Sequence, residues 1–136
     1  MRHLAIAIAL SLSPLPALAD CRTEDSEVGT TASVVGEVLD LVVGRTDLQA
    51  IPITAQNRNA FERAAAALDV FRAGLERHVE ALEAAQTPMM ACLLGAVVEY
   101  DQDQLAIMSE ARAAARALVP LAVTYIAAHE VLQATR

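Results

Sequence analysis

The chain contains no lysine and no tryptophan, and its 136 residues include only two phenylalanines and two tyrosines. Its ten basic residues are therefore all arginine, and seventeen acidic residues outweigh them to give a net charge of −7. A nucleic-acid-binding protein needs a basic stripe that displaces counterions from phosphate. Because these arginines are spread singly among the acids, the composition excludes a nucleic-acid partner and disfavours binding to anionic lipid.

Several motifs of catalytic and cofactor-binding proteins are also missing. The sequence has no CxxCH for covalent haem, no Glu-x-x-His repeat for a di-iron centre, no GxSxG around a nucleophilic serine and no glycine-rich phosphate loop. The acidic cluster Glu99, Asp101 and Asp103 lacks the glycine and the terminal glutamate of a calcium loop. We therefore expect no enzymatic activity, no cofactor and no metal site, and we assign no catalytic residue.

Alanine supplies much of the apolar fraction of 55%. It favours helices at no side-chain entropy cost but adds little buried surface. Together with the helical spacing of the larger apolar residues, this composition predicts an all-α chain with a thin core. At this length a single domain is the usual outcome.

The first nineteen residues have the organisation of a secretory signal peptide. A short basic start precedes an apolar run over 4–12, and residues 17–19 have the small-x-small form of a cleavage site. The run is far shorter than the about 20 residues of a transmembrane helix. We expect residues 1–19 to be removed. The remaining single domain, 20–136, would be periplasmic or secreted, without stable insertion in a membrane.

Export would place the two cysteines, Cys21 and Cys92, in an oxidising compartment. They leave no odd thiol and lack the CxxC spacing of a metal site, so we expect them to form a disulfide. Closing a loop of roughly 72 residues, this bond would contribute about 4 kcal/mol to stability. Lipidation of Cys21 is the alternative. Asp20 argues against it, because the residue before a lipidated cysteine is normally small and uncharged.

Apolar spacing predicts helices joined by short breaks. The first helix has acids at its start and Gly44 as a C-cap, although its valines would also suit a strand. Thr87 and Pro88 are expected to end one long helix and to begin the next, and Pro120 to end or kink that one. The expected helices are 25–44, 54 or 57 to 87, 88–118 and 121–136, with a linker over 45–53. They predict a three-to-four-helix bundle built on a long antiparallel helical hairpin.

A hairpin that turns at Thr87-Pro88 sets residues of its two helices level with each other. Counting outward places Glu99 about level with His78, and Gln104 opposite Phe71. Gln104 is polar in an otherwise apolar seam, so it either pairs to fix the register or lies in water at the edge of the bundle.

The predicted disulfide also orients the helices. Cys21 lies at the start of the first helix and Cys92 at the start of the third, so these two should run parallel, with the second antiparallel between them. Gly29, Ser33 and Gly36 lie near one face of the first helix, which predicts close packing against a neighbour there.

His78, His129 and Glu99 are the candidate ligand-binding residues. An imidazole buried beside a carboxylate has a charge that its environment tunes, and the alternative is a histidine whose ring packs at the boundary of the core. His129 and Glu130 form a second titratable pair. Helical bundles that carry haem use histidine and methionine, so a haem, metal or small-molecule carrier with His78 or His129 as ligand is one possible function.

The tail Tyr125-x-x-x-His129-Glu130, together with export, two cysteines and helices, is similar to periplasmic immunity proteins of the all-helical kind. This resemblance implies a protein that binds and blocks a secreted toxin. We expect an exported, non-enzymatic protein, immunity-like or chaperone-like, that binds a protein partner through a helical surface.

Overall fold

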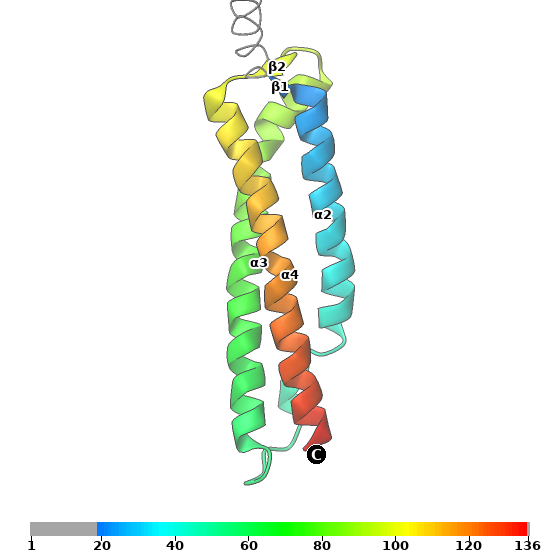
Figure 1. Ribbon diagram of the computed structural model, residues 1–136, viewed down its shortest axis with the longest axis vertical. Coiled ribbons are helices and arrows are strands. Elements are labelled where there is room, and N and C mark those ends of the chain that lie inside the picture. The colour runs from blue at the N-terminus through cyan, green and yellow to red at the C-terminus, as the bar shows by residue number, and fades with distance from the viewer. Residues whose placement is uncertain (1–18, 136) are drawn as a thin grey trace, which may run out of the picture.

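The structure is a computed structural model that describes residues 19–135, so the predicted signal peptide lies outside it except for Ala19. In this part of the chain, three long helices form a bundle (Figure 1): α2 (Cys21–Val43), α3 (Arg58–Leu93) and α4 (Gln102–Ala134). The predicted all-α class, a helical bundle with one disulfide, is confirmed. Two short strands, β1 (Ala19–Asp20) and β2 (Glu99–Tyr100), pair at one end, and a 3-10 turn, η2 (Leu48–Ala50), lies in the linker.

The central helix of the bundle is α4, which packs along most of α3 and also along α2. Helices α2 and α3 make few contacts with each other (Figure 1). As predicted, the first and third helices run parallel and the second runs antiparallel to both, but the predicted place of Cys92 at the start of the third helix is wrong, because Cys92 lies at the end of the second. The prediction that the second helix lies between the other two is wrong, because the third helix occupies that position.

Helix α2 settles the choice between helix and strand for the valine-rich segment. It begins at Cys21, earlier than predicted, because the Asp20 carboxylate accepts a hydrogen bond from the Arg22 amide at 2.9 Å and caps the first turn. It ends at the predicted C-cap, Gly44. The predicted close approach at Gly29 and Gly36 is wrong, because both residues are exposed and a Cβ built on either would meet nothing within 4 Å.

The predicted break at Thr87-Pro88 is wrong, because α3 continues through Pro88 to Leu93. A proline inside a helix removes one hydrogen bond and crowds the preceding turn, which destabilises the helix by about 3 kcal/mol. Here Pro88 is itself buried, and Cys92 is buried one turn later, so packing offsets the lost bond. Gly95, two residues beyond the end of the helix, has a positive φ of 75°, which lets the Ala96 and Gly95 amides bond back to the last carbonyls of the helix.

Pro120 likewise neither ends nor divides the third helix, so the predicted separate helix over 121–136 is wrong. Pro120 is exposed on the outer side of α4, where the Arg116 carbonyl that loses its helical partner can bond to water. Beyond it the buried stripe continues with Tyr125, His129 and Leu132. This packing holds the last part of the chain in one long helix.

Moving the turn from residue 87 to the segment 94–101 changes the register of the hairpin. Gly74 lies against Leu118 and Leu121, because a Cβ built on it would be 3.2 and 2.7 Å from their terminal carbons. The predicted pairs of residues, including Phe71 with Gln104, are therefore wrong. Two clusters of buried apolar side chains fill the bundle, one around the disulfide and Tyr100, the other around Phe71 and Tyr125.

Candidate functional site

His78 lies on the inner face of α3 and is 5% exposed, in agreement with its predicted place in the seam. The register of Gly74 against Leu118 sets it about level with Ala115, which is also buried. Its Nδ1 is buried and has no hydrogen-bond partner. Burial lowers the pKa of His78, because the charged ring would lose its hydration without gaining a partner. The geometry favours a neutral imidazole that packs in the core.

His129 lies on the inner face of α4, where it is 8% exposed and its ring is 6.0 Å from that of Tyr125. Burial is the main cause that lowers its pKa, and the positive charge of Arg45 adds to it. The neighbouring Tyr125 hydroxyl donates a hydrogen bond to the Arg45 carbonyl. His129 therefore lies beside the hydrogen bond that joins α4 to the linker.

The candidate residues do not converge on one site. Measured from the level of Gly74, His78 lies one turn toward one end of the bundle and His129 two to three turns toward the other, a separation of about 20 Å at 1.5 Å per residue. Glu99 lies in β2, at the end of the bundle and about 20 Å along the axis from His78, so the prediction that they lie level is wrong. No group of three or more potential metal ligands occurs within residues 19–135.

Gln104 does not fix the register of the hairpin, and it lies half-exposed at the end of the bundle. It is the third residue of α4, and its side chain accepts a hydrogen bond from the Asp101 amide at 3.0 Å. The Asp101 carboxylate accepts in turn from the Gln104 amide at 2.8 Å. This capping box fixes the start of α4.

The end of the bundle that contains the disulfide is closed by several independent contacts; we call it the disulfide end. Cys21 and Cys92 are bonded, as predicted, with their Cα atoms 6.0 Å apart. The Cys21 amide also donates to the Val98 carbonyl at 3.0 Å, and β1 pairs antiparallel with β2. A disulfide of this kind is typical of an oxidising, extracellular environment.

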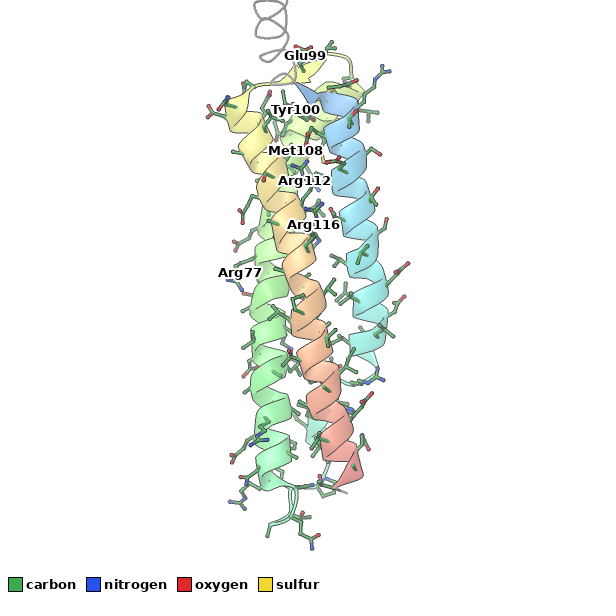
Figure 2. The ribbon with its side chains drawn as sticks, in the orientation of Figure 1. Arg77, Glu99, Tyr100, Met108, Arg112 and Arg116 are labelled. Carbon is green, nitrogen blue, oxygen red and sulfur yellow. A yellow bond between two sulfur atoms is a disulfide. The ribbon has the colours of Figure 1, made fainter. Side chains whose placement is uncertain are left out.

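Side chains of α2 and of the start of α4 add to this closure. The Tyr100 hydroxyl donates to Asp25, and Arg112 forms ion pairs with Glu24 and Glu27 of α2 (Figure 2). Burial, followed by the hydrogen bond to Asp25, raises the pKa of Tyr100, which keeps its hydroxyl protonated as a donor. The loop between α3 and α4 is thereby held against β1 and the start of α2.

The last turn of α3 and the loop after it nevertheless expose large apolar side chains. Met90, Leu93, Leu94 and Val98, which we call the apolar tip, are 54%, 79%, 75% and 73% exposed. Concave surfaces border the tip near Arg22 and Gly95. Exposed apolar residues that occur together on a rigid element are typical of interaction sites.

The sequence does not reveal the apolar tip, because Met90 and Leu93 continue the helical spacing of the preceding residues and so resemble residues of a buried helix face. Two local signals mark the turn. Gly95 follows a helical run, and Asp101-x-x-Gln104 has the form of a capping box. One signal ends a helix and the other begins the next one, so together they predict that no helix runs through residues 94–101.

Comparison of the chain with protein-family models, with curated proteins and with solved structures found no match.

Proposed function

We propose that this chain is an exported, non-enzymatic helical bundle that binds a protein partner through the apolar tip. The observation that carries the proposal is the exposure of Met90, Leu93, Leu94 and Val98, which is between 54% and 79% on the last turn of α3 and the loop after it, a segment that the disulfide fixes. A fixed loop loses little conformational entropy on binding, which favours affinity.

The contrast with the core supports a role in binding. Apolar side chains of similar size, such as Leu118 and Leu132, are fully buried elsewhere in the bundle. Leu93 and Leu94 contribute little to that burial, although their backbone is held in place. A bound partner would remove these two side chains from water, which favours association.

Charge at the same end of the molecule supports a protein partner over an anionic membrane. Asp20, Glu99, Asp101 and Asp103 are all exposed there, and Arg22 is an exposed cation close to Asp20. Anionic lipid would repel these carboxylates. The partner that fits is a protein with an apolar cleft bordered by basic side chains, because complementary charges at the rim steer association.

Affinity capture from the exported fraction of the native host, followed by mass spectrometry, tests the proposal. The immobilised mature chain is compared with the variant Leu93→Ser/Leu94→Ser and with a control, Val79→Ser, whose substituted residue is 46% exposed on α3 away from the tip. We expect a protein that wild type and control retain and the tip variant loses. Equal retention by all three would contradict a binding role for the tip.

A further inference from the structure

The outer face of α4 is a second apolar surface, separate from the tip. No acidic residue occurs between Glu110 and Glu130, and no charged residue between Ala117 and Ala128. Of the helices in residues 19–135, α4 is the one that is long and apolar enough by composition to cross a membrane. Its buried stripe faces α2 and α3, and the apolar residues outside this stripe are exposed or half-buried, with Arg116 and Val119 bordering a groove beside α2.

The exposed residues of this face form a stripe with a charge at each end. Arg116, Val123 and Glu130 are spaced seven apart, so they lie on one side of α4, and all three are exposed. Val119 and Val123 are 38% and 61% exposed. Figure 2 shows Arg116 on α4 one turn beyond Arg112, which is engaged with α2. Neither Arg116 nor Glu130 forms an ion pair among the described residues.

We propose that two copies of this chain associate through the outer faces of their α4 helices, antiparallel about a two-fold axis at Val123. Residues that pair across such an axis lie at equal distances from Val123 along the helix. Arg116 of each copy therefore meets Glu130 of the other, and Val119 meets Ala127. The contact is self-complementary in charge and apolar at its centre.

The charge pattern favours a second copy of the chain as the partner and the antiparallel orientation of the two α4 helices. A parallel pair would place Arg116 beside Arg116 and Glu130 beside Glu130, which is repulsive. Elsewhere an acidic surface would repel a second copy, whereas the face between Glu110 and Glu130 is free of acids.

Apolar grooves on both sides of α4 widen the contact beyond a single helix. One, of about 450 Å³, lies between α3 and α4 and includes Val70 and Leu121, and the other lies between α2 and α4 and includes Val34. Val70 and Val34 are 51% and 41% exposed. Stable dimers need more buried area than one helix stripe provides, and these flanks would add to it.

The dimer is independent of the proposed function, because Val123 lies about 33 Å along α4 from Asp101 at the disulfide end. A variant of the apolar tip should therefore leave dimerisation unchanged, and a variant of Arg116 should leave the apolar tip intact. Failure of one proposal can thus be told from failure of the other.

Sedimentation equilibrium of the mature, disulfide-bonded chain over a concentration series tests the proposal. We expect a monomer–dimer equilibrium that Arg116→Glu weakens by about tenfold, because it turns two attractive contacts into repulsive ones. Glu130→Arg should have the same effect. The double variant Arg116→Glu/Glu130→Arg should restore dimerisation, since it restores both pairs.

Cross-linking locates the axis. Val123→Cys should form an intermolecular disulfide on oxidation, whereas Val79→Cys, on the exposed side of α3, should not. A chain that stays monomeric at every concentration would overturn the proposal, as would a dimer that is insensitive to Arg116→Glu or not restored by the double variant. A monomer that instead floats with zwitterionic lipid vesicles would assign the face to lipid and would also overturn it.

Discussion

The two ends of the bundle are closed in different ways. At the disulfide end, a covalent bond, a strand pair and the Tyr100–Asp25 hydrogen bond hold a loop whose large apolar side chains face solvent. At the opposite end, which we call the linker end, the connection between α2 and α3 buries its own apolar side chains, Leu48 and Ile51. The linker end thus contributes to the core, whereas the disulfide end presents apolar surface that the core does not use.

The linker end has no disulfide cross-link among its described residues, and polar contacts close it in addition to its buried side chains. Asn57 is 1% exposed, and its side chain accepts from the Thr54 amide at 2.7 Å and donates to the Pro52 carbonyl at 2.8 Å. Tyr125 adds a hydrogen bond to the Arg45 carbonyl. Stability at this end therefore comes from the folded chain itself, and stability at the other comes largely from a cross-link that limits the unfolded state.

Breaking the covalent closure should have the largest effect on stability. The variant Cys21→Ala/Cys92→Ala removes a cross-link between residues 71 apart in sequence, which should lower the free energy of unfolding by about 4 kcal/mol. Urea denaturation of the variant and of the oxidised wild type measures the difference, with reduced wild type expected to match the variant. Two free thiols in unfolded wild type kept without reductant would contradict the cross-link.

Breaking the polar closure should have about half that effect. Asn57→Ala removes two side-chain hydrogen bonds and leaves the Thr54 amide and the Pro52 carbonyl without their partner, which should cost about 2 kcal/mol. The matched control is Asn59→Ala, two residues further on and exposed, which should change the free energy of unfolding little. Equal losses in the two variants would contradict the role assigned to Asn57.

Acidification should weaken the linker end through His129. Its pKa in the folded protein is lowered from 6.5, so the unfolded chain binds a proton near pH 6.5 that the folded chain resists. The free energy of unfolding should therefore fall as the pH drops below 6.5, by at most about 1 kcal/mol down to about pH 5.5 for each such histidine. His78 should act in the same direction, because burial lowers its pKa too.

The variants His129→Gln and His78→Gln separate these contributions. Each should flatten the pH dependence of unfolding between about pH 5.5 and 6.5, because glutamine does not titrate there. Hydrogen exchange of the linker amides at the same pH values should accelerate on acidification in wild type and less so in His129→Gln. An unchanged pH profile in both variants would show that the two imidazoles are not held neutral by the fold.

Much of the fold could be predicted because the deciding features are local. The helical spacing of Val28, Val35 and Val42 and the C-cap at Gly44 identify α2, and two cysteines that leave no odd thiol identify the disulfide. The start of α3 after Asn57 also follows from the end of a proline-containing linker. These features depend on the residues themselves and on their near neighbours.

The two long helices were mispredicted at Pro88 and Pro120, where local and tertiary terms oppose each other. A proline costs one helical hydrogen bond, whereas the buried residues beyond each proline, such as Cys92 and Tyr125, gain packing that depends on the whole bundle. The size of that gain cannot be obtained from the sequence near the proline. Because the turn was expected at residue 87 and lies at residues 94–101, the residues of the apolar tip were expected in the core.

For the candidate site, the seam position of His78 was predicted correctly, but its neighbours were not. Its burial follows from helical spacing, whereas its distance from Glu99 depends on where the hairpin turns. The apolar tip has no sequence signature of its own, because exposed and buried leucines look alike until the turn at Gly95 is recognised.

The measurement that tests the central claim most directly combines unfolding and binding in one protein, Leu93→Ser/Leu94→Ser. Because both leucines are more than 70% exposed, we expect its free energy of unfolding to stay within about 0.5 kcal/mol of wild type while it loses the partner that wild type captures. A fall in stability of about 2–5 kcal/mol, the cost of truncating a buried leucine, would place the tip in the core. That result, or undiminished capture by the variant, would contradict the account.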